Sequence, residues 1–223
     1  GGAGAMMNSF VRIEPNNVIT MLANNSEFGN GAYTVMSMML AEELDVDYRS
    51  IALEAAPTTP EYYSPLFREY LTAGSVTTGS TFMPMRTAGA KARAMLLEAA
   101  SRVWNVPISE LTTGDATVTH AGSGRTSTYG ELLEVIHRLD IEPPETVTLK
   151  DPSEFKILGK PTRRYEGAGK VDGTAEFGID IKLPGMLYGA IARPPVHGGS
   201  VIDFDATEAL AMQGVVKVKA IRA

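Results

Sequence analysis

The residues best suited to bind a ligand lie in a glycine-rich loop near the start of the chain. Residues 27–34 read Glu-Phe-Gly-Asn-Gly-Ala-Tyr-Thr and directly precede a helical pattern. Glycine lets the backbone approach a ligand closely, and the first turn of a helix presents amides that have no partner within the helix. Such a helix start attracts a phosphate or another anion. The loop is therefore a candidate anion site, although its residues alone favour a tight turn between a strand and a helix.

A second candidate loop lies at residues 77–81, which read Thr-Thr-Gly-Ser-Thr. Hydroxyl side chains beside a flexible backbone can wrap a phosphate or the polar groups of a pterin. Clusters of Ser, Thr and Gly are also common in turns that bind nothing. Both interpretations stay open for this segment.

The first loop also permits a dinucleotide-binding interpretation, because Gly29 and Gly31 precede a helix and Glu54 lies roughly 20 residues further on. Thr34 stands where the third glycine of that fingerprint is required, and the polar residues 24–26 separate the preceding strand from the loop. A nicotinamide-dependent dehydrogenase is therefore an alternative function with a weaker basis in the residues.

Other kinds of catalytic site find no support in the residues. The chain has no cysteine, which excludes iron–sulfur, disulfide and thiolate zinc sites held by this chain alone. The three histidines, His120, His137 and His197, are far apart, and none has a partner at metal-ligand spacing. Glu42 and Glu43 are expected on the outward face of their helix. We therefore predict no catalytic residue and no protein-ligated metal.

The composition is that of a folded protein, with 44% hydrophobic and 21% charged residues in a chain of 223. A net charge of -6 and a pI near 5.2 argue against a nucleic-acid partner, because phosphate binding needs a positive field. No apolar stretch approaches about 20 residues, so no membrane span is predicted.

The elements around the first loop can be predicted from β-rich runs, turn residues and periodicity. Residues 10–13 and 18–22 are β-rich runs joined by Glu-Pro-Asn-Asn, which indicates a hairpin. Apolar residues between 32 and 44 share one helical face, and residues 51–55 alternate as a strand. The glycine-rich loop should therefore connect a strand to a helix.

The following stretch predicts a loop and then two helices. Residues 61–85 show no sustained period and are expected to be loop with short extended pieces. Residues 87–104 follow a 3.6-residue period and indicate an amphipathic helix. A short strand is expected at 117–120. Thr128 and Glu131 then have the spacing of a capping box, which places the start of a helix near residue 129.

Composition shifts suggest three parts of the chain. Residues 1–6 open with Gly-Gly-Ala-Gly-Ala and are interpreted as a vector-derived scar. A proline-rich and charged segment between 141 and 156 is interpreted as a linker, so the first domain is expected at 7–145 and the second at 146–223. The second is expected to be a small α+β domain with one short helix that starts at Asp205. Its strands are expected at 174–181, 186–192, 201–204 and 215–220.

Two distant stretches resemble the same family. Residues 25–34, continued by Leu-Ala-Glu-Glu-Leu-Asp at 40–45, resemble the Glu-Met-Gly-Gln-Gly-x-x-Thr motif and the following helix of the molybdopterin-binding large subunits of the xanthine dehydrogenase/aldehyde oxidase family. Residues 159–188, with Gly-Lys-Pro at the start and Leu-Pro-Gly-Met-Leu-Tyr at the end, resemble the start of that family's α/β hammerhead domain. The helix at 86–104 is similar to the isoquinoline 1-oxidoreductase beta-subunit branch.

The resemblance implies an α+β fold in which a partial molybdopterin-binding domain is followed by the first part of a hammerhead domain. It also implies that both glycine-containing loops bind the cofactor, with Asn30 and Phe28 where the family usually has Gln and Met. The cofactor-binding residues implied in this way are Phe28, Gly29, Asn30, Gly31, Thr34, Gly79, Ser80 and Thr81.

The implied enzyme oxidises an aldehyde or an N-heterocycle, with water as the source of oxygen and molybdenum as the electron acceptor. Its cofactor is molybdopterin, in the simple form or as the cytosine dinucleotide, and its partner is an iron–sulfur subunit on a separate chain. The resemblance also implies a periplasmic location, with the cytoplasm as the alternative. The family's catalytic Glu lies further along than residue 223, so this chain is expected to be an inactive fragment without cofactor. A non-catalytic module that keeps the fold is a further alternative, suggested by Asn30.

Overall fold

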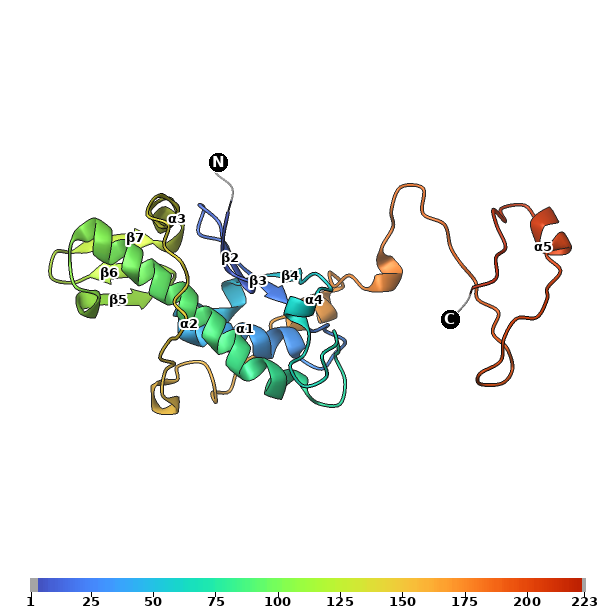
Figure 1. The fold of residues 1–223 in the computed structure, drawn as a ribbon, viewed down its shortest axis with the longest axis horizontal. Helices are drawn as coiled ribbons and strands as arrows, with labels where there is room; N and C mark the ends of the chain where they lie inside the picture. Colours follow the sequence, from blue (N-terminus) through green and yellow to red (C-terminus); the bar gives the residue numbers. More distant parts are fainter. Residues whose placement is uncertain (1–3, 222–223) are drawn as a thin grey trace. The chain divides into compact units, whose positions relative to one another are not determined.

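The computed structural model describes residues 4–221, and the contacts within it divide the chain into two units. The first unit extends to Ala175 and the second begins at Glu176 (Figure 1). The first unit contains every strand of the described chain and both candidate loops.

A four-stranded sheet opens the first unit, in the order β1-β2-β3-β4. The predicted hairpin is confirmed, because β2 and β3 pair antiparallel around the turn at residues 14–17. β4 lies parallel to β3, so the chain crosses over between them through α1. The bounds are Ala5–Asn8 for β1, Val11–Ile13 for β2, Ile19–Ala23 for β3, Ala52–Ala55 for β4 and Ala32–Leu44 for α1.

The first residues of the described chain take part in this sheet. Ala5 pairs with Ile13 and Met6 pairs with Arg12 across β1 and β2. Ala5 and Met6, which the sequence assigns to a vector-derived scar, thus extend the ladder of the hairpin through their backbone groups. Residues 1–3 lie outside the described part of the chain.

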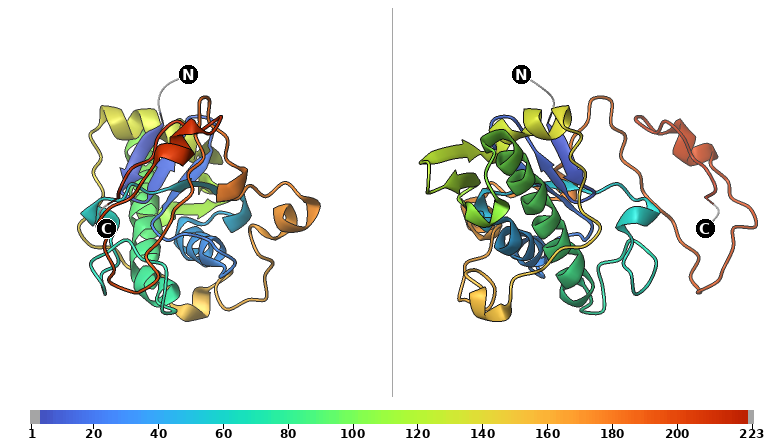
Figure 2. Two further views of the ribbon diagram at one scale, coloured as in Figure 1. Left: turned by 90° about the vertical axis from the view of Figure 1, so that its right-hand side faces the viewer. Right: turned by 60° about the vertical axis from the view of Figure 1, so that its left-hand side comes forward.

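Helix α2 (Thr77–Trp104) packs along α1, and Figures 1 and 2 show the two helices side by side. The prediction of a helix at 87–104 is confirmed. The predicted loop at 77–81 is wrong, because these residues form the first turns of α2. Thr81 is 1% exposed, so burial favours helix where the composition suggested a turn, and its hydroxyl is satisfied within the helix by donating to the carbonyl of Thr77. A Cβ on Gly89 would lie 2.5 Å from the Leu40 carbonyl oxygen, so glycine permits this close helix contact.

A second sheet and a third helix complete the first unit. β5 (Leu111–Gly114), β6 (Thr117–His120) and β7 (Arg125–Thr128) pair antiparallel, as expected for the strand at 117–120. α3 (Tyr129–Arg138) begins with the predicted capping box. The short helical elements are η1 Tyr48–Ser50, η2 Pro60–Tyr62, η3 Ile108–Glu110, η4 Pro152–Glu154 and α4 Gly167–Asp172.

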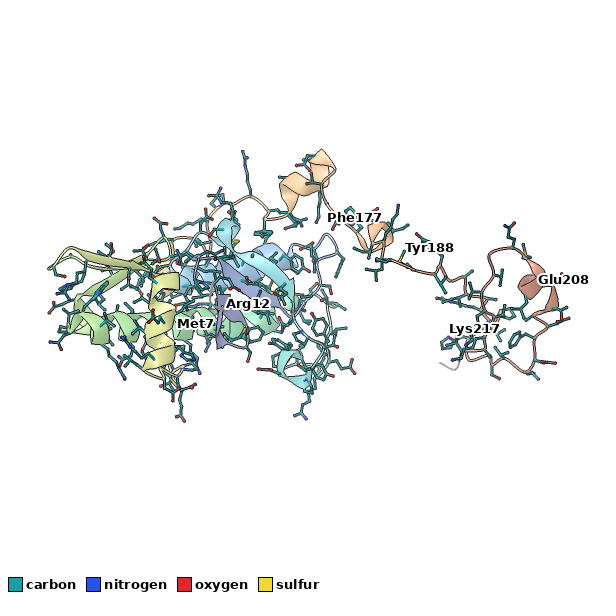
Figure 3. All side chains as sticks on the ribbon, turned by 90° about the horizontal axis from the view of Figure 1, so that it is seen from above. Met7, Arg12, Phe177, Tyr188, Glu208 and Lys217 are labelled. Atoms are coloured by element: carbon teal, nitrogen blue, oxygen red, sulfur yellow. The ribbon has the colours of Figure 1, made fainter. Side chains whose placement is uncertain are left out.

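The core of the first unit gathers side chains from β1, β2, β3 and all three long helices. Met7, Met36 and Leu96 are each at most 1% exposed, and Figure 3 shows Met7 among the side chains of this unit. Burial of such side chains stabilises the unit by about 1.5–3 kcal/mol each. No helix within residues 4–221 has the length and apolar character needed to cross a membrane.

Two adjacent glutamates of α1 are buried, which corrects the expectation that they face solvent. Glu43 is 0% exposed and its carboxylate accepts hydrogen bonds from the Arg86 guanidinium at 2.7 and 2.9 Å and from the Lys150 backbone at 3.2 Å. Glu42 is 1% exposed and accepts hydrogen bonds from the backbone N–H groups of residues 156–158 at 2.7 to 3.0 Å. Buried carboxylates require such partners. The two glutamates therefore face the interior of the unit and not the solvent.

These bonds hold the segment that was expected to be a linker. The boundary expected between 145 and 146 falls inside the first unit, which extends to Ala175. The segment is polar and proline-rich, yet its backbone N–H groups supply the partners of Glu42 and Glu43. Polar composition alone therefore did not distinguish a solvated linker from a segment that satisfies buried charges.

The second unit contains two short helical elements, η5 (Gly178–Asp180) and α5 (Thr207–Ala211). The predicted short helix is present, but it begins at Thr207 with Ala206 as its N-cap, two residues after the predicted start at Asp205. The Asp205 carboxylate accepts a hydrogen bond from the Thr207 N–H at 2.8 Å. The four strands expected between 174 and 220 do not form in the described residues. Tyr188 is 81% exposed and Ile202 97%, and Figure 3 shows Tyr188 on an irregular stretch of the second unit. Strands need partners and a packed face, and these side chains have neither.

Replacement of Glu43 by alanine should lower the free energy of unfolding by about 3–5 kcal/mol, because it leaves the Arg86 guanidinium buried without its carboxylate. The measurement is urea denaturation of both proteins at pH 7. Glu98→Ala is the matched control, since Glu98 pairs with Arg102 on the surface and should cost at most about 1 kcal/mol. Equal losses in the two variants would contradict the structural role given to Glu43.

Candidate functional site

The glycine-rich loop lies exposed at the start of α1. Gly29, Asn30 and Phe28 are exposed, and the Phe28 ring retains 68% of its accessible surface. Gly29 has φ of 102° and Gly31 has φ of 84°, and both values lie in the region that favours glycine. The loop therefore has the exposed position before a helix that its glycine spacing predicted.

One carboxylate of the chain itself occupies the amides of this loop. Glu27 accepts hydrogen bonds from the backbone N–H groups of Gly29 at 2.6 Å, Gly31 at 3.1 Å and Tyr33 at 3.3 Å. The Glu27 side chain is 7% exposed. In this structure an internal anion therefore binds at the helix start for which the sequence left an external anion open.

The pKa of the Glu27 carboxyl reflects these bonds. Burial by itself raises the pKa, but the hydrogen bonds from Gly31, Gly29 and Tyr33, together with the Lys170 ammonium, outweigh burial and lower the pKa below its ordinary value of 4.5. Glu27 is therefore ionised at neutral pH and acts as an acceptor for all three amides.

Residues 162–170, here called the strap, lie against the loop from a distant part of the sequence. Arg164 donates from its guanidinium to the carbonyl oxygen of Gly29 at 2.9 Å. The Lys170 ammonium lies 3.6 Å from the carboxylate of Glu27 and 3.4 Å from that of Glu166. The strap thus brings two cations and one further carboxylate to the start of α1. The cofactor-binding residues predicted from the sequence did not include Glu27, Arg164 or Lys170. The one local signal for Glu27 was its position two residues before Gly29.

Thr34, which the family motif places at the cofactor, contacts the strap instead. It is 8% exposed, and its hydroxyl donates to the Glu166 carboxylate at 2.8 Å. The same oxygen accepts the backbone N–H of Tyr165 at 2.9 Å. Both hydrogen-bonding functions of Thr34 are therefore used within the protein, and in this structure it holds the strap in place.

The start of α2 lies beside the glycine-rich loop. A cleft of about 450 Å³ is lined by Phe28 and Asn30 from the loop and by Thr77 and Thr78 from α2. Its remaining lining residues are Ala32, Val35, Ala73, Gly74 and Ser75. None of the lining residues carries a charge. Figure 2 shows α1 and α2, whose first turns contribute to this cleft, from two directions.

The second predicted set of ligand-binding residues, Gly79, Ser80 and Thr81, lies within α2, where the first is exposed and the other two are buried. Ser80 is 6% exposed and its hydroxyl lies 3.4 Å from the carbonyl of Thr77, while Thr81 contacts the sulfur of Met39. Gly79 is exposed, and a Cβ at this position would meet nothing within 4 Å. Of these three predicted residues, none lines the cleft; their neighbours Thr77 and Thr78 do.

The described residues offer no group of three His, Cys, Asp or Glu side chains that could hold a metal ion. His120 is buried, and its ring nitrogens lie 2.7 Å from the Ser123 hydroxyl and 2.9 Å from the Glu110 carboxylate. Any metal at the cleft would therefore need ligands from a cofactor or from other parts of a larger protein.

Comparison with known proteins identifies a family for most of the chain. Residues 3–181 match the family model described as the molybdopterin cofactor-binding domain. The chain is 31% identical to the isoquinoline 1-oxidoreductase subunit beta of Brevundimonas diminuta, over 88% of this chain and 29% of that protein. It is 28% identical to the membrane-bound aldehyde dehydrogenase (pyrroloquinoline-quinone) of Gluconacetobacter polyoxogenes, over 92% of this chain and 26% of that protein.

A solved structure gives a partial match to the chain. The crystal structure of quinoline 2-oxidoreductase from Pseudomonas putida 86 is 18% identical, with a TM-score of 0.43, and the match covers 62% of this chain and 17% of that one. The chain thus spans less than a third of the length of the curated relatives named above.

Replacement of Glu27 by glutamine should destabilise the protein at pH 7 by about 1.5–3 kcal/mol, because charge-assisted hydrogen bonds are lost. The pKa of Glu27 is lower in the folded protein than in the unfolded chain, so its contribution is fully present above about pH 4.5. As the pH falls below 4.5 through the folded-state pKa, the contribution is lost, and the two proteins should converge in stability.

Thermal unfolding of both proteins between pH 3 and 7 measures this difference. Glu145→Gln is the control, since this exposed residue undergoes the same change of charge at a surface position. A difference between wild type and Glu27→Gln that stays constant down to pH 3 would contradict an ionised Glu27 in the loop.

Proposed function

This chain belongs to the molybdopterin cofactor-binding domain family, and we propose that it forms one wall of the cofactor site of a molybdenum hydroxylase. The observation that carries the proposal is the uncharged cleft beside the glycine-rich loop, inside the residues that match the family. We propose that Phe28, Asn30 and the backbone of Gly29 and Gly31 contact the cofactor there. Thr77 and Thr78 would contribute from the facing helix.

The residues present suit a cofactor that brings its own metal ligands. The chain has no cysteine, and the described residues contain no metal-binding cluster. A pterin that carries a dithiolene holds its metal without protein thiolates, and its ring is a neutral, planar group of hydrogen-bond donors and acceptors. The aromatic ring of Phe28 and the hydroxyls of Thr77 and Thr78 provide matching surfaces.

The substrate class is proposed from the relatives. Their names specify isoquinoline in one case and an aldehyde in the other, so we propose oxidation of an aldehyde or an N-heterocycle. When bound, molybdopterin with its molybdenum would accept the substrate's electrons, and water would supply the oxygen. This chain's part is to bind and orient the cofactor. The molybdopterin would be in the simple form or the cytosine dinucleotide form.

A partner chain is proposed from the same reasoning. The isoquinoline relative is a beta subunit by name, and this chain has no cysteine for an iron–sulfur cluster. We therefore propose that electrons leave through an iron–sulfur subunit on a separate chain.

The dinucleotide-binding alternative fits the structure less well. β3, α1 and β4 form one parallel crossover unit, and Glu54 lies within β4. The Glu54 carboxylate, which would have to bind a ribose hydroxyl, lies 2.7 Å from the Arg12 guanidinium. The other neighbours in the sheet pair antiparallel, so the sheet lacks the parallel series of that fold.

Replacement of Gly29 by alanine in the intact subunit, produced with its partner, should lower the bound molybdenum severalfold. The new Cβ projects from the exposed loop, and φ of 102° also makes alanine unfavourable by about 1–2 kcal/mol. Gly124→Ala is the matched control, because Gly124 also has a positive φ and open space around it but lies in the turn between β6 and β7. Molybdenum per protein is measured by mass spectrometry, and equal contents in the two variants would exclude Gly29 from the site.

The 223-residue chain by itself should contain no molybdenum and oxidise neither aldehydes nor N-heterocycles. The chain spans less than a third of the length of its curated relatives, so we expect most of the cofactor's hydrogen bonds to be missing, and each one to a charged group forfeits about 1.5–3 kcal/mol of binding. Metal analysis and a dye-reduction assay of the purified chain test this. Stoichiometric molybdenum or turnover by the chain alone would mean that the cofactor site lies elsewhere.

A further inference from the structure

We propose that Glu27 is a positioning residue that acts as the built-in anion of the glycine-rich loop and excludes phosphate from the start of α1. The loop is thereby left to contact an uncharged part of a ligand through the cleft at Phe28 and Asn30. The second statement rests on the proposed function, whereas the first concerns the chain alone. The phosphate of a cofactor would then be held by other segments.

The amides of the glycine-rich loop are already occupied. The carboxylate of Glu27 accepts the N–H groups of Gly29, Gly31 and Tyr33, which are the groups that a phosphate at this helix start would need. A phosphate placed there would have to displace an ionised, nearly buried side chain. It would also have to remain near the displaced charge, because Glu27 is only two residues before Gly29.

The charged side chains around the loop balance each other. The strap brings the cations Arg164 and Lys170, and the carboxylates nearby are Glu27 and Glu166. Two positive and two negative groups leave no net positive charge for a phosphate dianion. The two cations also have partners already, since Arg164 donates to the Gly29 carbonyl and Lys170 lies between the two carboxylates. The field at the loop therefore does not favour a second anion.

The cleft that adjoins the loop is uncharged. Its volume of about 450 Å³ is in the range of small-ligand sites, and its lining residues are all uncharged. Phe28 presents an exposed ring, and the side-chain oxygen of Asn30 accepts the Ala32 N–H at 3.2 Å. This surface suits a planar neutral ring and offers no cation to a phosphate. Glu27 is not among the residues that line the cleft. It binds the loop amides, so Phe28 and Asn30 remain at the cleft.

The experiment is a titration of the 223-residue chain with inorganic phosphate and with acetate, followed through the backbone amide signals of Gly29, Gly31 and Tyr33. In the wild-type chain, neither anion should shift these signals. In Glu27→Ala, acetate and phosphate should shift all three, with an affinity at least about tenfold above that of the wild type, because the amides and Lys170 have lost their carboxylate. Acetate should also restore the melting temperature of this variant.

Glu131→Ala is the matched control, because Glu131 also lies in the first turn of a helix but accepts a single backbone N–H, from Thr128. Acetate should not restore its melting temperature. If Glu27→Ala folds poorly in plain buffer, its refolding yield with and without acetate gives the same readout. Wild-type amides that respond to phosphate as strongly as the variant, or a variant that acetate fails to restore, would overturn the proposal.

A parallel titration with a pterin distinguishes this result from the proposed function. Shifts at Phe28 and Asn30 in the wild-type chain, without shifts at the amides bound by Glu27, would support an uncharged ring in the cleft. Unmoved signals at Phe28 and Asn30 would count against the proposed cofactor contact. The role of Glu27 as the internal anion would then still be decided by the acetate and phosphate titrations.

Discussion

The structure depends on the burial of two neighbouring carboxylates in the middle of its first unit. Glu42 and Glu43 follow each other on α1, so they point in different directions around the helix, and both are at most 1% exposed. Each needs partners because an unpaired buried charge would cost several kcal/mol. Glu43 obtains them from Arg86 on α2 and from the Lys150 backbone, and Glu42 obtains them from the backbone at residues 156–158. One helix is thereby tied to its neighbour and to a segment more than 100 residues away.

The candidate site lies at the start of α1 and is connected to the buried glutamates through residues 156–170. The segment held by Glu42 continues into the strap, whose Tyr165 bonds Thr34 and whose Arg164 bonds the carbonyl of Gly29. The same α1 helix that carries the buried pair begins at the loop that Glu27 shapes. The position of the loop beside the start of α2 is thus a consequence of charges satisfied two to three turns further along the helix. A cleft that is itself uncharged is built by a network of ion pairs that all lie outside it.

The parts predicted correctly from the sequence depend on signals from neighbouring residues. The hairpin at β2 and β3, the capping box of α3 and the second half of α2 each follow from turn residues, a capping pair or an unbroken period. The start of α2 was missed because Thr77 to Thr81 have the composition of a turn, whereas in the structure Thr81 is buried and contacts Met39 of α1. Glu42 and Glu43 were misplaced because their partners come from distant segments. The glycine-rich loop was found, but its amides could equally serve an external anion or Glu27, and only the coordinates distinguish the two.

The central claim is that the loop before α1 contacts the uncharged part of the cofactor, and that the Glu27 carboxylate is the anion bound by the loop amides. The most direct measurement is a crystal structure of the intact subunit with its cofactor bound. The account predicts that the Glu27 carboxylate still accepts the N–H groups of Gly29, Gly31 and Tyr33, that the pterin ring lies against Phe28 and Asn30, and that the cofactor's phosphate binds elsewhere. A phosphate oxygen on those three amides, with the Glu27 side chain displaced, would contradict it.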